Sequence, residues 1–284
     1  MTEFNSYHRS SEQIKEIISE IQTGNQTLPE NREVLCKILS FIDLTSLEGS
    51  DTRTKIVSVC EKAKSFHLLG PDIPDVAAVC FYPPLIRYAK NELQHTDIHV
   101  ASVAGAFPSG QSPLSAKIEE LKFAIQEGAD EIDTVISRGK FLEGEHAFVF
   151  DEIAAIKETC GNIHLKVILE TGELQTIQNI RTASQIAINA GADFIKTSTG
   201  KIQPAATEEA FFVMAETIKE YFQKTGKKIG IKPAGGISTP KQALGYVNIL
   251  NDVLGMEWMN KALFRIGASR LTDNIVSRIN SLEI

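Results

Sequence analysis

The chain has few of the residues that hold small disulfide-bonded or metal-bound domains together. Its 284 residues include only four cysteines, Cys36, Cys60, Cys80 and Cys160, and no two of them form a CxxC pair. A disulfide-stapled secreted domain would be shorter and richer in cysteine, so we expect free thiols in a reducing compartment. The six histidines show neither HxH nor HExxH spacing, and we therefore predict no metal site.

Excess positive charge and long apolar runs are also missing. The formal net charge is −7, which argues against non-specific nucleic-acid binding, although a pocket for one small anion needs only a few groups. No apolar run approaches the roughly 20 residues of a membrane span. Met1–Ser10 is too polar for a signal peptide. Without a nucleotide-binding fingerprint either, we expect a cytoplasmic protein with no cofactor and no membrane or nucleic-acid partner.

What the sequence does contain is a regular alternation of short apolar runs and longer amphipathic segments. Strands that alternate with helices form parallel βαβ units. Eight such units in a chain of this length predict an α/β fold, a single (β/α)8 TIM barrel. The eight candidate strands are Leu39–Asp43, Val76–Phe81, Ile98–Val103, Glu131–Val135, His164–Leu169, Phe194–Thr197, Ile229–Lys232 and Ala262–Ile266.

The first segment of the chain stands apart from this alternation. Ser11–Ile21 has isoleucines at helical spacing, a break follows between Gly24 and Pro29, and Glu30–Leu39 predicts a second helix. We therefore divide the chain into an N-terminal helical leader, residues 1–35, and a barrel domain, residues 36–284. We expect the leader to cover the bottom of the barrel.

Ionisable side chains fall at the carboxyl ends of several predicted strands, where a TIM barrel carries its active site. They include Asp43, Asp133, Lys196 and Lys232. A lysine in a buried strand needs a paired charge or a lowered pKa, and a neighbouring ammonium group lowers the pKa below its ordinary value of about 10.4. A neutral amine attacks carbonyl groups and forms Schiff bases.

An ordinary ion pair or a solvated side chain is the competing interpretation of any one of these lysines. The alternation of strand residues also allows Lys166 to face inward. From the residues alone, the choice of nucleophile among the lysines therefore stays open. Asp133 is a candidate to balance their charge and to pass protons.

Glycine-containing loops follow the last three predicted strands, at Thr197–Lys201, Pro233–Gly236 and Gly267–Arg270. Plain turns also use glycine, but three such loops on adjacent strands favour an anion site, because exposed backbone N–H groups bind phosphate. TIM barrels commonly bind phosphate at the loops after strands 7 and 8, beside a helix N-terminus. The residues thus predict a phosphate-binding barrel enzyme with a reactive lysine.

At these residues the sequence resembles the deoxyribose-phosphate aldolase (DeoC) family. Phe194–Lys201 resembles the family's Schiff-base segment, which points to Lys196, and Gly230–Ile237 resembles its second-lysine segment, which points to Lys232. Gly128–Val135 resembles the segment with the catalytic aspartate, Asp133. Further similar segments, within a resemblance that runs from about residue 36 to 275, are Ile42–Leu47, Val79–Pro83 and Lys166–Leu174.

The resemblance implies a lyase that reversibly splits 2-deoxy-D-ribose 5-phosphate into D-glyceraldehyde 3-phosphate and acetaldehyde, without a metal. Lys196 would form the iminium, and Lys232 would lower the pKa of that amine by repulsion. Asp133 and Lys232 would move protons, with support from Asp43. The implied substrate-binding residues are Thr45, Thr199, Gly200, Lys201, Gly235, Gly236 and Ser269.

The chain departs from the family pattern at Arg270, where many members have a small hydroxyl residue, and in the segment Pro108–Ser112. The Arg270 side chain would add a bidentate phosphate contact or point to solvent. One alternative is another class I sugar-phosphate aldolase on the same fold, which would use a donor other than acetaldehyde. A second is a non-catalytic barrel that only binds a sugar phosphate. Barrels of this kind often pair, so we expect a homodimer.

Overall fold

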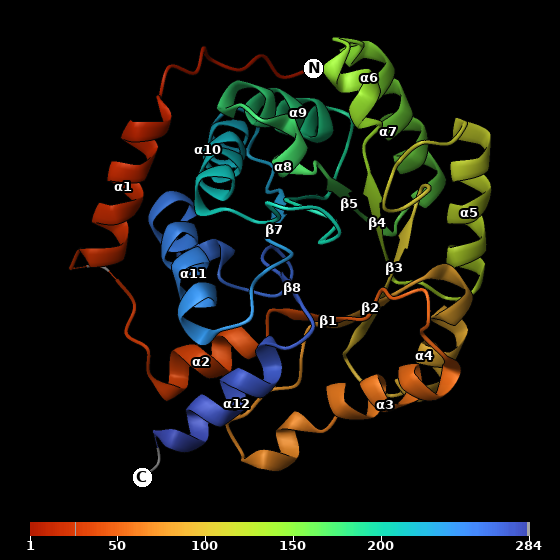
Figure 1. The fold of residues 1–284 in the computed structure, drawn as a ribbon, viewed down its shortest axis with the longest axis vertical. Helices are drawn as coiled ribbons and strands as arrows, with labels where there is room; N and C mark the ends of the chain where they lie inside the picture. Colours follow the sequence, from red (N-terminus) through yellow and green to blue (C-terminus); the bar gives the residue numbers. More distant parts are fainter. Residues whose placement is uncertain (26, 283–284) are drawn as a thin grey trace.

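The computed structural model describes residues 1–25 and 27–282, and these contain a sheet of eight parallel strands (Figure 1). Gln26, in the predicted leader, and Glu283 and Ile284, in the predicted barrel domain, lie outside the described residues. Neighbouring strands pair in the order β7-β6-β5-β4-β3-β2-β1-β8. The strands are β1 Ile42–Thr45, β2 Ala78–Phe81, β3 His99–Ala104, β4 Glu131–Val135, β5 His164–Ile168, β6 Phe194–Lys196, β7 Gly230–Lys232 and β8 Ile266–Ala268.

The two edges of this sheet meet between β7 and β8. Two isolated parallel bridges join them, Ile231 with Phe264 and Ala234 with Gly267. The backbone N–H of Arg265 also donates to the carbonyl oxygen of Ile231 at 3.2 Å. The sheet is therefore a nearly closed barrel, which confirms the predicted fold class.

Helices cover the outside of the barrel (Figure 1). Several begin at a threonine whose hydroxyl accepts a backbone N–H of the first turn, namely Thr52, Thr176, Thr207 and Thr239. None of the helices in the described part of the chain is long and apolar enough to cross a membrane. The α-helices are α1 Ser11–Thr23, α2 Arg32–Leu39, α3 Arg53–Ala63, α4 Ile86–Glu92, α5 Leu114–Gln126, α6 Arg138–Leu142, α7 His146–Cys160, α8 Thr171–Leu174, α9 Ile177–Asn189, α10 Glu208–Thr225, α11 Pro240–Leu254 and α12 Leu271–Ser281.

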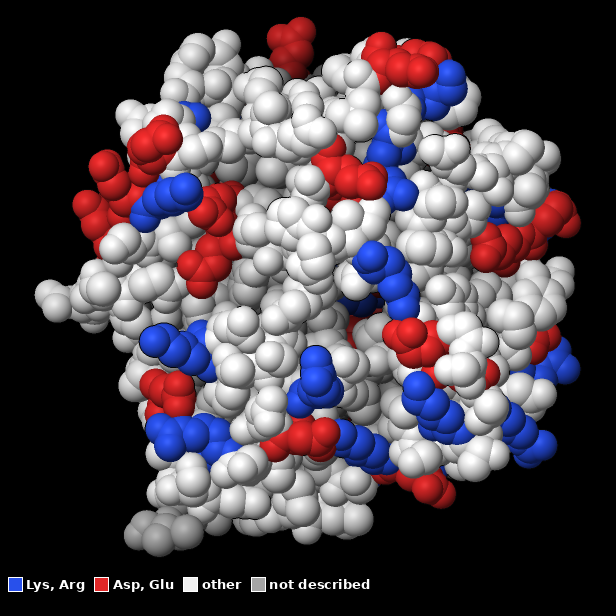
Figure 2. Space-filling model, viewed as in Figure 1, with Lys and Arg blue, Asp and Glu red and all other residues white. Residues whose placement is uncertain are grey.

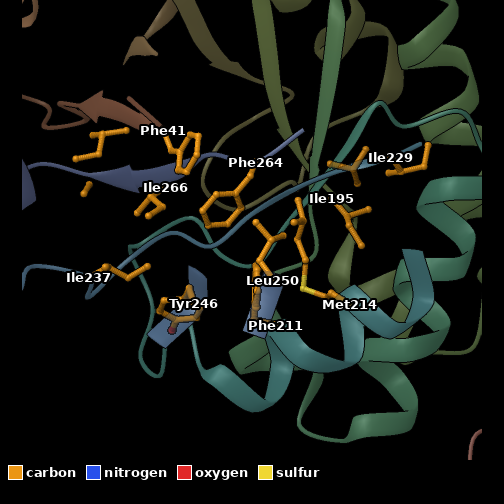
Figure 3. Packing of buried hydrophobic residues seen from close by; sticks show 14 of the residues in the cluster. Phe41, Ile195, Phe211, Met214, Ile229, Ile237, Tyr246, Leu250, Phe264 and Ile266 are labelled. Atoms are coloured by element: carbon orange, nitrogen blue, oxygen red, sulfur yellow. The ribbon is translucent and has the colours of Figure 1, made fainter. Parts of the chain in front are cut away.

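The main hydrophobic core lies between the outer face of the strands and the helices. Figure 3 shows part of it, where Ile195 of β6 and Phe264 before β8 lie among side chains of α10 and α11. Phe264 packs edge-on against both Phe41 and Phe211, with ring centroids 5.4 and 6.1 Å apart. Since these side chains are fully buried, this layer supplies the apolar burial that stabilises the fold.

The inner face of the barrel is different. One part of it is a small apolar cluster: Leu47, Cys80, Ala101, Val103, Phe107, Val135 and Ile168. The other part is charged, and its buried members are Asp43, Glu131, Asp133, Lys166, Lys196, Lys232 and Arg265. A barrel filled with charged groups positions a site at its interior, so the fold itself directs attention there.

Two strand predictions were displaced by a few residues. The first strand was expected at Leu39–Asp43, but Leu39 ends α2 and the strand begins at Ile42. The last was expected at Ala262–Ile266 and begins at Ile266, because Asn260 organises a turn before it. Its side chain accepts the N–H of Ala262, and its carbonyl oxygen accepts the N–H of Phe264. Apolar residues in a helix end and in a turn were mistaken for strand residues.

The leader does not cover the bottom of the barrel with its first helix, as was expected. Its first helix, α1, packs on the outer faces of α10 and α11 (Figure 1). Ile14 and Ile18 are buried there, and the Gln22 amide donates to the carbonyl oxygen of Gly245 at 3.0 Å. The amphipathic pattern predicted the helix correctly, but it carries no information on which surface the helix covers.

Candidate active site

All four predicted catalytic side chains, those of Asp43, Asp133, Lys196 and Lys232, meet inside the barrel. Lys196 and Lys232 lie opposite each other on β6 and β7. Both ammonium groups donate to the same atom, Oδ2 of Asp133 on β4, at 2.8 Å. Lys232 also donates to Asp43 on β1. Side chains from four different strands therefore form one connected cluster, in which Asp133 binds both lysines and Asp43 binds Lys232.

The ends of β6 and β7 are tied together just beyond the two lysines. The N–H of Thr197 donates to the carbonyl oxygen of Lys232 at 3.0 Å. The Thr197 hydroxyl accepts the N–H of Ala234 at 3.0 Å and lies 3.3 Å from its carbonyl oxygen. These bonds fix the relative height of the strand ends, and with it the separation of the two amines.

Asp133 and Lys232 are held in their charged forms. Burial alone would raise the pKa of the Asp133 carboxyl, but Lys166, Lys196 and Lys232 outweigh it and hold that pKa well below its usual range. Burial would lower the pKa of Lys232, yet Asp133 and Asp43 raise that pKa above its ordinary value. The pair is therefore an ion pair over the physiological pH range.

Lys196 has the opposite shift. Burial lowers the pKa of its amine, Asp133 offsets part of that effect, and the nearby Lys232 ammonium lowers it further. The net result is a pKa below the ordinary value of a lysine. A lysine that loses its proton more readily is a better nucleophile toward a carbonyl carbon.

The structure also separates the lysines by their access to the cavity. Lys166 faces inward but is fully buried, and it contacts Glu131 and Asp133 at 2.5 and 2.9 Å. Burial lowers its pKa, but those two carboxylates outweigh burial and the pKa ends above the ordinary value. Lys196 lines the cavity, whereas Lys166 does not. The amine that reaches open space is therefore the one with the lowered pKa.

A cavity of about 500 Å³ opens above these groups at the carboxyl ends of the strands. Every residue predicted to bind substrate lines it: Thr45, Thr199, Gly200, Lys201, Gly235, Gly236 and Ser269. In the space-filling view this face is hollowed near its centre, and Lys and Arg side chains stand around the hollow (Figure 2). The cavity thus combines one amine of lowered pKa, that of Lys196, with basic surroundings.

The glycines of the loop after β7 give the cavity wall its shape. Gly235 and Gly236 have φ of +88° and +82°, backbone angles that residues other than glycine rarely adopt. A Cβ on Gly235 would lie 2.9 Å from Cα of Gly200 and 2.7 Å from the Ala205 methyl. The loops after β6 and β7 therefore pack backbone to backbone at the wall of the cavity.

The departure at Arg270 has a definite place. Arg270 is exposed, lines the cavity and precedes the first residue of α12, Leu271. The N-terminus of α12 and the guanidinium group therefore lie on the same side of the cavity as Ser269. The other departure, Pro108–Ser112, does not line this cavity. The carbonyl oxygens of Pro108 and Ser109 instead accept from Arg138 at 3.0 and 2.8 Å.

Two acidic residues at the site, Glu48 and Glu170, were not among the predicted catalytic or substrate-binding residues, although Glu170 was recognised as an ionisable residue near the end of a predicted strand. Glu48, after β1, pairs with Lys201 at 2.9 Å across the cavity mouth. Glu170, after β5, accepts the N–H of Thr199 at 3.2 Å and contacts Arg138 at 3.3 Å. Glu170 has a φ of +56°, but that signal is not visible in a sequence. Among the described residues, no three His, Cys, Asp or Glu side chains are grouped so as to hold a metal ion.

Comparisons with known proteins place this geometry in context. The pattern of the family described as "DeoC/LacD family aldolase" matches residues 37–247. The chain is 44% identical to human deoxyribose-phosphate aldolase over 256 residues, 86% of this chain and 80% of the relative. The mouse protein of that name gives 44% over 255 residues, with the same coverage. The solved structure of deoxyribose phosphate aldolase from Aeropyrum pernix, 23% identical, has the same fold, with a TM-score of 0.70 over 96% of this chain and 100% of that one.

Proposed function

The chain belongs to the DeoC/LacD family of aldolases, and from that premise we propose that it is a deoxyribose-phosphate aldolase that works through a Schiff base on Lys196. It is a lyase that reversibly cleaves 2-deoxy-D-ribose 5-phosphate to D-glyceraldehyde 3-phosphate and acetaldehyde. One observation supports the assignment of the nucleophile most strongly. Of the lysines around Asp133, Lys196 alone both lines the cavity and has a lowered pKa.

The first step is the attack of the Lys196 amine on the C1 aldehyde. The amine adds to C1, water leaves, and a protonated imine remains. The lowered pKa of Lys196 keeps more of the amine neutral, and the Lys232 ammonium next to it favours that form. Asp133, 2.8 Å from Lys196 Nζ, is the counter-ion of the iminium once it forms.

The carbon–carbon bond breaks in the second step. The C3 hydroxyl gives up its proton, the C2–C3 bond breaks, and its electron pair moves into an enamine on Lys196. Protonation of C2 and hydrolysis then release acetaldehyde and restore the amine. Asp133 and Lys232, directly or through one water, move these protons, since they share a 2.8 Å hydrogen bond beside the reacting amine. Asp43 holds Lys232 from the other side.

The phosphate is bound at the other end of the cavity. Backbone N–H groups of Gly235 and Gly236, the Ser269 segment at the N-terminus of α12 and the Arg270 guanidinium form an anion site there. Lys201 adds a further cation, and Thr45 and Thr199 offer hydroxyl groups to the sugar. A phosphate fixed at this end would direct C1 toward Lys196.

Reductive trapping tests the nucleophile. The protein is incubated with 2-deoxyribose 5-phosphate and EDTA, sodium borohydride is added, and peptides are analysed by mass spectrometry. We expect a reduced adduct on the peptide that holds Lys196. No adduct in folded protein, or an adduct on a different lysine, would contradict the proposal.

Substitutions separate the roles of the two lysines. Lys196→Ala should abolish cleavage, whereas Lys232→Leu should still bind substrate but lose most of its rate. The matched control is Lys122→Ala, because the Lys122 side chain is 52% exposed on α5, outside the residues that line the cavity. Turnover that survives in Lys196→Ala would remove Lys196 as the nucleophile.

The donor in the synthetic direction distinguishes the remaining candidates. A deoxyribose-phosphate aldolase adds acetaldehyde to glyceraldehyde 3-phosphate, whereas a different class I sugar-phosphate aldolase would need another donor. A barrel that only binds sugar phosphate would bind the substrate without an adduct. The presence of Lys196, Lys232 and Asp133 on one carboxylate-centred cluster favours the first of these.

Assembly and location complete the proposal. We propose a homodimer, which sedimentation or light scattering of the purified chain would test. We also propose a cytoplasmic location, because the buried cysteines Cys60, Cys80 and Cys160 are free thiols, as suits a reducing compartment.

A further inference from the structure

Six buried side chains form a closed loop of ion pairs inside the barrel. Three of them, Glu131, Lys166 and Arg265, have no role in the proposed mechanism. We call this loop the charge ring. Carboxylates and cations alternate around it, so that each member contacts one opposite charge on either side. Its members are Asp43, Glu131, Asp133, Lys166, Lys232 and Arg265.

One half of the charge ring runs from Asp133 away from the cavity. Asp133 accepts from Lys166 at 2.9 Å, and Lys166 lies 2.5 Å from Glu131. Glu131 is two residues before Asp133 on β4, so it faces the same interior one layer deeper. Its carboxylate accepts from both terminal nitrogens of Arg265, at 2.7 and 3.3 Å.

The other half returns to the active site. Arg265 donates to Asp43 at 2.7 Å, and Asp43 contacts Lys232. Lys232 then closes the loop at Asp133, at 2.8 Å. Arg265 thus bridges two carboxylates, one of which holds the lysine next to the proposed nucleophile.

The balance of charge in this ring singles out Lys196. Three carboxylates face three cations, so the ring is neutral by itself. Lys196 is attached to it from outside, through Asp133. A buried charge without a partner of its own is costly, and Lys196 is the surplus cation of the barrel interior. Loss of its proton leaves the interior electrically balanced.

We propose that Arg265 and Glu131 are positioning residues for catalysis, which complete the charge balance of the ring and so make Lys196 the amine that gives up its proton. Neither residue lines the cavity, so both act through other groups. The inference rests on the proposed role of Lys196. Consistent with it, the pKa of Lys196 is lowered, whereas the pKa values of Lys166 and Lys232 are raised.

Other titratable groups near Lys196 do not change this count. Cys80 of β2 faces the same interior, but burial raises its thiol pKa to about 11, so the thiol stays neutral. His99 of β3 touches the ring from outside, with Nδ1 2.7 Å from Glu131, and its side chain is 46% exposed. Because His99 contacts Glu131 directly, the experiment is also run in a His99→Gln background.

The test uses two substitutions of opposite sign. Arg265→Gln leaves the ring with one excess negative charge, and Glu131→Gln leaves it with one excess positive charge. The readout is the pH midpoint of Lys196 acetylation by acetic anhydride, measured by peptide mass spectrometry against the exposed Lys122. We expect Arg265→Gln to raise the midpoint by about one pH unit and Glu131→Gln to lower it, each changing the neutral fraction at pH 7 about tenfold.

The double variant, Glu131→Gln with Arg265→Gln, is neutral again. Its midpoint should return to that of the unmodified protein, and it also serves if Arg265→Gln alone does not fold. Shifts of the same sign in both single variants, no shift in either, or a double variant with a displaced midpoint would overturn the proposal. Acetylation does not involve the sugar, so a protein that fails to cleave deoxyribose phosphate would count against the proposed function and not against the charge ring.

Discussion

Consecutive residues of the barrel strands are buried in two different environments, an apolar core outside the barrel and a charged cluster inside it. Ile195 of β6 packs outward into the apolar core, and Lys196 points inward to Asp133. Phe264 and Arg265 make the same contrast before β8. Outward side chains contribute about 1.5 to 3 kcal/mol each by leaving water. Inward charges are costly to bury, and only a neighbouring opposite charge offsets that cost. The outer layer holds the barrel together, while the inner layer sets protonation states.

The largest expected effect breaks the inner layer at its centre. In Asp133→Asn the shape is kept, but the carboxylate shared by Lys196 and Lys232 is lost. We expect kcat for cleavage to fall by about 10² to 10⁴, the usual contribution of a proton-transfer group. Steady-state kinetics would measure it, with Asp151→Asn on the exposed surface of α7 as the control. A rate within tenfold of the unmodified enzyme would remove Asp133 from the proton relay.

A change in the outer layer should have the converse result. Phe211 on α10 is fully buried and packs edge-on against Tyr246 and Phe264. Phe211→Ala should lower the free energy of unfolding by about 3 to 5 kcal/mol. The activity of each folded molecule should stay the same. Urea denaturation measures the first quantity and kcat the second, and Phe123→Ala, 43% exposed on α5, is the control. A fall in kcat comparable to that of Asp133→Asn would show that the two layers are not separable.

Acid should distinguish the two layers next. The folded-state pKa values of Asp43, Glu131 and Asp133 are lowered, because neighbouring cations outweigh burial. Their stabilising contribution is therefore present above the unfolded pKa of about 4 and is lost as pH falls through the folded values, at about 1.4 kcal/mol for each unit of lowering. Apolar burial has no such dependence. Urea unfolding at pH 7, 5 and 3 should give a free energy that drops between pH 5 and 3, and it should drop less in Asp133→Asn.

The smallest effect is expected at the mouth of the cavity, where the charged side chains are exposed to solvent. Glu48 and Lys201 form a partly exposed pair at 2.9 Å. Glu48→Gln should free Lys201 for the substrate phosphate and lower KM by about twofold to fivefold, because exposed pairs are weak. kcat should not change. A higher KM would mean that Glu48 positions Lys201 for binding instead of competing with the phosphate.

Much of this inner layer was accessible to sequence analysis. Their positions at the ends of predicted strands placed Asp43, Asp133, Lys196 and Lys232 at one end of the barrel, and the structure brings them together. Alternation could not rank Lys166 against Lys196, because both face inward and only their depth below the cavity differs. The depth of a side chain below the cavity depends on how all eight strands are offset along the barrel, and no local sequence pattern encodes that offset.

Non-local pairs account for the rest of what was missed. Arg265 finds Glu131 and Asp43 more than a hundred residues away in the chain, and it lies in a stretch that was read as a strand. Glu170 acquires its place through a positive φ and through Thr199 on the next strand end. Glu170 was visible near a predicted strand end and Arg265 within a predicted strand, but sequence spacing does not encode the contacts that give either residue its place.

The join between β7 and β8 has a consequence for motion. Here two isolated bridges replace a continuous ladder, so the backbone amides of Ile231 and Gly267 should exchange with deuterium sooner than those in the middle of β4. The loops proposed to hold the phosphate follow these same two strands. A bound phosphate would contact the loops on both sides of the join between β7 and β8. Slower exchange of those amides in the complex would show that the substrate stabilises the closure of the barrel.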